Sequence, residues 1–329
     1  MSRNRSSVLK TRVGMPEQAS REPGSGHAEP ETTRRRVVAV ISGASRISPE
    51  EVAASLTRDG DVDLEIRVAN SSSEATSAAT EAGLSARIVI AVGGDGTVSD
   101  VATGIFGSGA ALGIVPAGST NIAARSLGIP VDPAAALTLL GGTHRIRAID
   151  IGRSEDRSFV HIAGAGFDAE LFRGASPVWK RRLGWFAYLP AAVSALRLPP
   201  SEVLITADGA SLEARSPLVL VANGGSAIAP QFRIYPGITV DDGWLDVLIF
   251  ASSTPAQLAA TLGLAGTQRL DRSPHVTHRR ARTVGIEAMP PLPVELDGDP
   301  RGTTPRKFSI IPLGLRVVTP LRGRDTGSQ

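Results

Sequence analysis

The stretch Gly93-Gly94-Asp95-Gly96-Thr97 places three glycines around a carboxylate, directly after the apolar run Ile88–Val92. The apolar run predicts a buried parallel strand, and residues 98–103 can continue as a helix. A helix that begins after glycines has free backbone N–H groups at its positive end, which suits a phosphate ligand. The alternative is a tight turn whose Asp or Thr caps the helix, which a lone Gly-x-Gly would favour. The cluster here is longer and has a partner downstream, so we predict a phosphate site.

That partner is a second loop of small residues, Gly118-Ser119-Thr120-Asn121, which follows the apolar run Ala111–Val115. Short strands alternate with helices through this half of the chain, a pattern that predicts a parallel, doubly wound sheet. In such sheets, ligands bind at the carboxyl ends of the strands, where both loops fall. We expect the two loops to form one phosphate cradle, with Asp95, Thr97, Ser119, Thr120 and Asn121 as its side chains.

Two common nucleotide sites are excluded. A P-loop requires a lysine after its glycines, and no lysine occurs between Lys10 and Lys180. A dinucleotide fingerprint requires a third glycine where Ser99 stands, and no ribose-binding acid follows. Protein-kinase signatures are also missing from the sequence. A triphosphate in the predicted cradle would need a divalent cation to neutralise its charge.

Composition narrows the class of protein. The chain has 329 residues, enough for two domains, with 42% apolar and 20% charged residues and a net charge of only +3. This charge and the 4% aromatic content argue against a nucleic-acid partner. The lack of cysteine excludes disulfide scaffolds, zinc–thiolate sites and cysteine nucleophiles. His275 and His278 form the closest histidine pair, in an Arg-rich segment that we expect to be a solvated loop. No signal peptide or spanning helix is recognisable, so we expect a cytoplasmic protein.

The chain divides by pattern into four parts. Residues 1–34 and 321–329 have the composition of disordered tails. Residues 35–145 form the α/β domain, in which Ser48 and Pro49 predict a capped helix start. Residues 146–320 predict a mainly β second domain, a sandwich whose last strand can return to the first domain. Its predicted strands are 146–151, 159–163, 203–207, 218–222, 244–250, 283–288, 294–296, 308–311 and 316–318.

Two helical segments interrupt the second domain. The first, Lys180–Leu198, is too short to span a bilayer and contains Pro190, so a core or interdomain helix is favoured over membrane contact. The second is Pro255–Leu264. The pairs Asp208-Gly209 and Asp297-Gly298 are, from spacing alone, hairpin turns.

Several ordered motifs together resemble the catalytic domain of diacylglycerol and sphingosine lipid kinases. The resemblance extends over residues 35–320. Its first motif is shared with NAD kinases and phosphofructokinases, whereas the full ordered set is specific to the bacterial soluble lipid-kinase group. The motifs are Gly93 to Thr97, Leu112 to Arg125, Gly164-Ala165-Gly166-Phe167-Asp168-Ala169, Leu183 to Tyr188, Asp241 to Asp246 and Leu296-Asp297-Gly298-Asp299-Pro300.

The resemblance implies a lipid kinase with ATP in the cleft between an α/β domain and a β-sandwich. It implies Asp297 as the general base for a lipid hydroxyl and Mg²⁺ as the cofactor, with ATP as co-substrate. A structural magnesium site would use Thr239, Asp242 and the backbone carbonyl of Trp244. Asp95 is expected to position metal-bound water. The nucleotide would be contacted by Gly93, Gly94, Asp95, Gly96, Thr97, Ser99, Gly118, Ser119, Asn121 and Asp299.

Two departures from the family pattern stand at the predicted site. The first loop is usually Asn-Pro-x-Ser-Gly and is Ile41-Ser42-Gly43-Ala44-Ser45 here. The usual Asp-Gly-Glu is Asp297-Gly298-Asp299, which keeps the charge but shortens the second acid by one methylene. Both leave room for weak or altered activity.

The leading hypothesis is therefore an ATP- and Mg²⁺-dependent kinase for diacylglycerol or a similar lipid alcohol. Its expected partners are ATP, the lipid alcohol and a transient membrane surface, at the inner face of the membrane, with a homodimer as a candidate assembly. Two alternatives stay open. One is an NAD kinase-like enzyme, and the other is a catalytically weak regulator that binds lipid or nucleotide.

Overall fold

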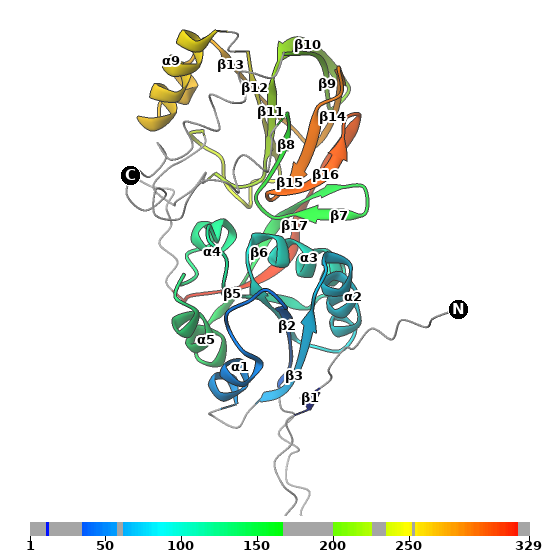
Figure 1. The fold of residues 1–329 in the computed structure, drawn as a ribbon, viewed down its shortest axis with the longest axis vertical. Helices are drawn as coiled ribbons and strands as arrows, with labels where there is room; N and C mark the ends of the chain where they lie inside the picture. The colour runs from blue at the N-terminus through cyan, green and yellow to red at the C-terminus, as the bar shows by residue number, and fades with distance from the viewer. Residues whose placement is uncertain are drawn as a thin grey trace, which may run out of the picture.

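The structure is a computed structural model that describes residues 11–12, 35–57, 62–166, 200–225, 235–251 and 254–321. Two lobes lie one above the other along the long axis of the molecule (Figure 1). Most of both predicted tails, the helix predicted over 180–198 and residues 167–169 lie outside the described residues.

Four parallel strands form the core of the N-terminal lobe in the order β3-β2-β4-β5. Alternate side chains of these strands enter two apolar cores, one beneath α1 and α5 and the other beneath α2, α3 and α4. Every residue of β4 and β5 is buried, which explains their continuous apolar sequences. The elements are β2 (Arg35–Ser42), α1 (Pro49–Leu56), β3 (Val62–Ala69), α2 (Ser72–Gly83), β4 (Ile88–Gly93), α3 (Asp95–Ile105), β5 (Ala111–Pro116), α4 (Ile122–Ser126) and α5 (Pro133–Gly141). A short strand, β1 (Thr11–Arg12), pairs antiparallel with β3 and lies within the segment predicted to be a tail.

The predicted helix start at Ser48 is confirmed. The Ser48 hydroxyl accepts from the Glu51 N–H at 3.2 Å, and the Ser48 N–H donates to the Glu51 carboxylate at 2.7 Å. Such a reciprocal cap stabilises a helix by about 1 kcal/mol, because it satisfies N–H groups that have no partner inside the helix.

The second lobe is a β-sandwich. One layer has the strand order β13-β12-β11-β8-β15-β16, and the other contains β14, β9 and β10. Phe159 and Phe308 lie in the core between the layers, with ring centroids 6.2 Å apart in an edge-to-face contact. The elements are β8 (Ile162–Ala165), β9 (Ser201–Ala207), β10 (Ala210–Ser216), β11 (Leu218–Ala222), β12 (Leu245–Phe250), α9 (Pro255–Gly266), η2 (Leu270–Arg272), β13 (Val276–Ala281), β14 (Thr283–Met289), β15 (Pro293–Leu296) and β16 (Asp299–Thr303).

The long strand β17 (Arg306–Thr319) joins the two lobes into one mixed sheet. Its carboxyl end pairs in parallel with β5, its amino end pairs antiparallel with β14, and β6 (Arg145–Ser154) lies along its other edge. The predicted fold class, a parallel α/β domain followed by a β-sandwich, is confirmed. Two predicted strands, 308–311 and 316–318, are in fact this one strand, because a bulge between Ile311 and Leu315 lets it continue across both lobes.

Other expectations are corrected by the sheets. The segment predicted as one strand over 159–163 is divided between β7 (Arg157–Phe159) in one sheet and β8 in the other. The Arg-rich segment containing His278 is strand β13 and not a loop, because it pairs with β12 over six residues. The His278 ring forms a hydrogen bond with the Asp246 carboxylate at 2.6 Å. Within the described ranges, no helix combines the length and the apolar character needed to cross a bilayer.

Candidate active site

The two glycine loops meet backbone to backbone at the carboxyl ends of β4 and β5. The Ala117 N–H donates to the Gly93 carbonyl at 2.8 Å. A Cβ atom added to Gly118 would lie 2.6 Å from the Gly94 Cα, so a side chain at this position would force the loops apart. The predicted pairing of the loops therefore depends on glycine at position 118.

Asn121 and Asp95 hold the second loop in place. Asn121 has a left-handed backbone, with φ of 49°, and its side-chain amide bonds both the N–H and the carbonyl of Gly118. The Asp95 carboxylate accepts from the Thr120 hydroxyl at 3.0 Å and from the Ala123 N–H at 3.1 Å. Asp95 thus links the start of α3 to the start of α4, and this aspartate ties the two loops together.

The other predicted side chains of the cradle differ in exposure. Ser119 is exposed at the tip of its loop, and the Thr97 side chain packs against Gly93. The Ser99 side chain is buried, and its hydroxyl donates to the Ser158 carbonyl at 2.8 Å. The structure therefore does not bring the Ser99 side chain to the surface of the cradle.

The Asp297-Gly298 pair forms the turn between β15 and β16. Both residues have positive φ, 48° and 88°, as the central residues of a two-residue type I′ hairpin turn require. The Asp297 carboxylate accepts backbone N–H groups of three consecutive residues in the connection between β7 and β8: Val160 at 2.7 Å, His161 at 2.9 Å and Ile162 at 3.0 Å. These bonds interrupt the strand that the sequence predicted over 159–163.

The environment of Asp297 raises the pKa of its carboxyl group above the ordinary value. Burial raises the pKa of this carboxyl to about 6, the three backbone N–H groups oppose the rise, and the charge of Asp95 adds to it. This repulsion shows that the Asp297 carboxylate of one lobe lies near Asp95 in the glycine loop of the other. A carboxyl group with a pKa near neutrality can exchange protons at physiological pH.

Asp299 is the carboxylate that packs on the first glycine loop. A Cβ atom on Gly96 would lie 2.8 Å from Asp299 Oδ2, so the side chain rests against the first turn of α3. The Asp299 side chain is 39% exposed. Gly96 and Asp299, roughly 200 residues apart in sequence, are thus neighbours at the interface between the lobes.

A cluster that the sequence reasoning missed lies beside this contact. Arg157 donates to the Asp100 carboxylate at 3.0 Å and to the Thr76 hydroxyl at 2.7 Å. The Ser72 hydroxyl donates to the Asp100 carboxylate at 2.6 Å, and the Arg301 guanidinium forms an ion pair with the same carboxylate. Burial raises the pKa of Asp100, while its bonds to Ser72 and the arginines oppose that rise. The sequence did contain a signal for this cluster: Asp100 stands between the apolar positions Val98 and Val101. A carboxylate on a buried helix face requires a charged or hydrogen-bonding partner.

The predicted metal residues Thr239, Asp242 and Trp244 converge in one loop before β12. The Asp242 carboxylate accepts from the Trp244 N–H at 3.1 Å and from the Thr239 side chain, and it forms an ion pair with Arg280. Asp150, which is fully buried, fastens the loop by accepting the Gly243 N–H at 2.6 Å. No cluster of three acidic or histidine ligands occurs in the part of the chain that the structure describes. The donors are oxygen atoms, which suit Mg²⁺, so the residues fit the ion if it shares Asp242 with Arg280 or displaces that arginine.

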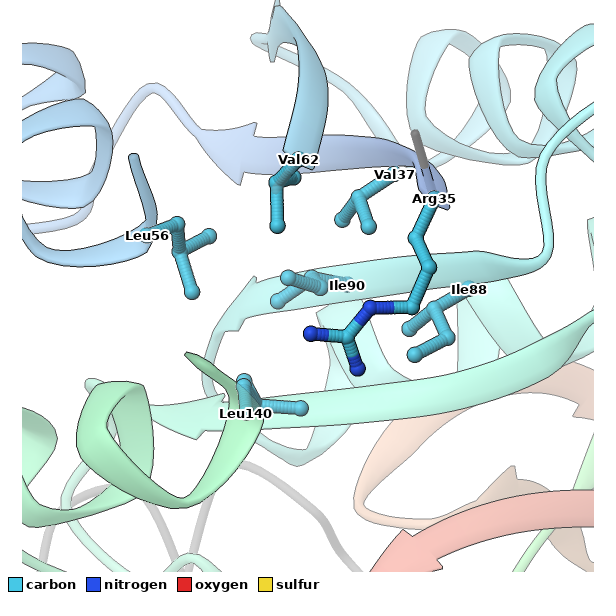
Figure 2. Close-up of a pocket in the computed structure, with 7 residues that line it drawn as sticks. All are labelled: Arg35, Val37, Leu56, Val62, Ile88, Ile90 and Leu140. Atoms are coloured by element: carbon cyan, nitrogen blue, oxygen red, sulfur yellow. The ribbon is translucent and has the colours of Figure 1, made fainter. Parts of the chain in front are cut away.

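A small cavity lies at the opposite end of the parallel sheet. It is lined by Arg35, Val37, Leu56, Val62, Ile88, Ile90 and Leu140 (Figure 2). The first residues of β2, β3 and β4 contribute to it, so it lies at the amino ends of these strands, away from the glycine loops. The cavity is therefore separate from the predicted nucleotide site.

Comparison with known proteins gives matches over both lobes. Residues 41–154 match the family described as the diacylglycerol kinase catalytic domain, and residues 161–319 match the YegS C-terminal NAD kinase beta sandwich-like domain. A diacylglycerol kinase of Bacillus subtilis is 33% identical over 255 residues, covering 75% of this chain and 82% of that protein. A Synechocystis protein, uncharacterized protein sll0036, is 30% identical over 71% of this chain; the chain spans only 55% of that relative. A crystal structure of a diacylglycerol kinase from Bacillus anthracis has the same fold, with a TM-score of 0.67 and 20% identity over 88% of this chain and 97% of that one.

Proposed function

Because this chain belongs to the diacylglycerol kinase catalytic domain family, we propose that it transfers the γ-phosphoryl group of ATP to the hydroxyl of diacylglycerol or a similar lipid alcohol. The observation that carries the proposal is the contact between Asp299 and Gly96. It joins the acidic hairpin of the sandwich lobe to the helix terminus and glycine loop of the α/β lobe. Acceptor chemistry and phosphate binding can then occur at one place, which a kinase requires.

The nucleotide part of the proposal rests on the first turn of α3. Its N-cap residue is Gly94, which offers no side-chain cap, so backbone N–H groups at this end are open to an anion. ATP would enter as its magnesium complex, which reduces the negative charge that Asp95 and Asp299 face. An NAD kinase-like enzyme would use the same cradle for the phosphates of ATP. The two activities differ in the acceptor of the phosphoryl group, which is a lipid alcohol in one and NAD in the other.

In the proposed reaction, the Asp297-Gly298-Asp299 turn accepts the proton of the lipid hydroxyl. Asp297 is the proposed base, because its pKa of about 6 leaves it mostly ionised at neutral pH and ready to accept a proton. Asp299 is the second candidate, because its oxygens are more open and lie beside the phosphate loop. A lipid acceptor also implies transient contact with a membrane surface.

The direct test is transfer of label from [γ-³²P]ATP. Purified protein should phosphorylate diacylglycerol in mixed vesicles, or one component of a total-lipid extract, in the presence of Mg²⁺. Label transfer to NAD, measured in parallel, would support the NAD kinase alternative. ATP binding without transfer to any lipid or to NAD would support the regulator and contradict the kinase.

The metal part of the proposal assigns Asp242, Thr239 and the Trp244 carbonyl to a structural Mg²⁺. Such an ion, when bound, would supply positive charge that stabilises the loop before β12. Millimolar Mg²⁺ is then expected to raise the melting temperature by a few degrees, equivalent to about 2.7 kcal/mol at a hundred times the Kd. Differential scanning fluorimetry with Mg²⁺ or EDTA, without nucleotide, measures this effect.

The matched variants are Asp242→Asn and Asp241→Asn. Asp242→Asn should abolish the Mg²⁺-dependent rise in melting temperature, whereas Asp241→Asn should retain it, because Asp241 pairs with Arg147 outside the donor set. Equal melting temperatures of the unmodified protein in Mg²⁺ and EDTA would reject the metal site while leaving the kinase proposal intact.

A further inference from the structure

Arg301 lies on β16, two residues after Asp299, and its guanidinium spans three elements. One terminal nitrogen lies 3.4 Å from Asp299 Oδ2, 3.3 Å from the Ser72 hydroxyl at the start of α2, and 3.6 Å from Asp100 Oδ1 in α3. The side chain is 25% exposed. A single arginine of the sandwich lobe therefore contacts two helices of the α/β lobe and the acid beside the glycine loop.

Within the sandwich lobe, the β15–β16 hairpin is held by the pairing of β15 with β8 and by the bonds of Asp297 to residues 160–162. β16 is the last strand of its layer and pairs only with β15 among the described strands. The hairpin lies at the boundary between the lobes, above α3 (Figure 1). As an edge strand of five residues, β16 has no described neighbour strand on its other side, so no second ladder holds Asp299 and Arg301. The contacts of Arg301 supply a tether on the side that faces α2 and α3.

The positive charge of Arg301 also reduces the repulsion between Asp299 and Asp100. Burial is the main cause that raises the pKa of Asp100, and the nearby charge of Asp299 adds to it, so the two carboxylates repel each other across the lobe boundary. Arg301 lies within ion-pair distance of both and offsets this repulsion. Without it, Asp299 would turn away from Asp100, and hence away from the first turn of α3.

We propose that Arg301 is a positioning residue for phosphoryl transfer, holding Asp299 against Gly96 and thereby fixing the acidic turn relative to the phosphate loop. This inference rests on the proposed kinase function. Because small misplacements of reacting groups can lower a rate by about 10²-fold, loss of Arg301 should lower kcat by roughly 10- to 100-fold. Asp100 keeps its ion pair with Arg157 at 3.0 Å, so the fold should survive the substitution.

The test compares Arg301→Ala, Arg301→Lys and Arg215→Ala. Arg215 pairs with Glu202 on the exposed β9–β10 hairpin, so its replacement controls for the loss of a charged side chain from the same lobe. Arg301→Ala should lower kcat while its melting temperature stays within about 2 °C of that of the parent protein. The loss of a partly exposed ion pair changes the melting temperature by no more than about this amount. Arg301→Lys should restore part of kcat, because an ammonium can still reach Asp299, and Arg215→Ala should leave kcat unchanged.

A double-mutant cycle tests whether Arg301 acts through Asp299. In an Asp299→Ala background, Arg301→Ala should cause no further loss of kcat, since the group that it positions is gone. Multiplicative losses, an unchanged kcat in Arg301→Ala, or a loss that follows the melting temperature would each overturn the inference.

Hydrogen exchange keeps the inference testable if no acceptor is phosphorylated. Amides of residues 293–303 should exchange faster in Arg301→Ala than in the parent protein and in Arg215→Ala, because the hairpin has lost its tether. An inactive parent protein with this accelerated exchange would reject the kinase proposal and retain the tether. Unchanged exchange in Arg301→Ala would overturn the tether whatever the activity.

Discussion

Replacing Asp297 by asparagine is expected to lower kcat for lipid phosphorylation by about 10²- to 10⁴-fold, the usual contribution of a positioned base. Burial, with a smaller contribution from the charge of Asp95 in the other lobe, raises the pKa of this carboxyl to about 6. Asparagine has nearly the same shape and cannot accept the proton of the lipid hydroxyl. Steady-state kinetics with MgATP and vesicle-borne lipid measures the effect.

Asp297 also has a structural role, which the experiment must separate from catalysis. Its two oxygens accept three backbone N–H groups, and asparagine has only one oxygen, so the amide nitrogen would oppose one N–H group. Asp208→Asn is the matched control. Asp208 also begins a hairpin turn with positive φ, and its carboxylate accepts the backbone N–H groups of Arg282 and Thr283.

The two variants should differ in both turnover and stability. Asp208→Asn should lower the melting temperature by a few degrees with kcat unchanged, because the N–H groups of Arg282 and Thr283 lower the pKa of Asp208 and so stabilise its charge. Asp297→Asn should cost less stability, because burial raises the pKa of Asp297 and so disfavours its charge in the folded state. A similar fall in melting temperature with an unchanged kcat in Asp297→Asn would assign Asp297 to structure alone. Asp299→Asn, measured in parallel, would then identify the base if it alone abolishes turnover.

The pKa of Asp297 also predicts a pH dependence. If its carboxylate is the base, kcat/KM should fall roughly tenfold per pH unit below about pH 6, because the protonated form cannot accept a proton. Stability should change in the opposite direction. A carboxyl whose pKa is raised on folding stabilises the folded state fully below its unfolded pKa, and this contribution is lost as pH rises through about 6. Asp297→Asn should remove both dependences.

Gly118→Ala is expected to abolish nucleotide binding and lower kcat/KM for ATP by at least about 10²-fold, since the phosphate loop would be misplaced. The added Cβ would lie 2.6 Å from the Gly94 Cα, and backbone atoms cannot rotate away as a side chain can. The two loops must therefore separate, at a cost of about 1–3 kcal/mol in stability. Isothermal titration calorimetry with MgATP measures the loss of binding.

Gly285→Ala in β14 is the matched control for the added methyl group. Its Cβ would have its nearest contact at 3.7 Å, with the Thr206 Cβ, which is an ordinary van der Waals distance. This variant should bind MgATP like the parent protein. Unchanged MgATP affinity in Gly118→Ala, with the fold retained, would contradict the assignment of these loops to the nucleotide.

Much of the α/β lobe could be predicted from sequence because its signals are local. The apolar runs that became β4 and β5 are buried on both faces, and such strands need no partner information to be recognised. The Ser48 cap is determined by residues three positions apart. The full ordered set of motifs, from Gly93 to Pro300, was also sufficient to indicate the lipid-kinase family.

The sandwich was harder to predict because its strands depend on their neighbours. β13 carries histidine and two arginines in succession, and it is a strand because β12 supplies its hydrogen-bond partners. The run 159–163 has strand composition throughout, yet the Asp297 carboxylate takes the N–H groups that would have continued the ladder. Local propensity contains no information about either partner.

The sequence by itself determined that this protein has two glycine loops, a parallel sheet to carry them and an acidic turn that follows far along the chain. Only the tertiary structure decided that Asp299 lies against Gly96, that Asp95 joins the two loops, and that Arg301 tethers the hairpin to α2 and α3. The physical reason is that these contacts are made between segments separated by up to 229 residues. Their geometry is set by β17, which crosses both lobes and fixes how one packs on the other.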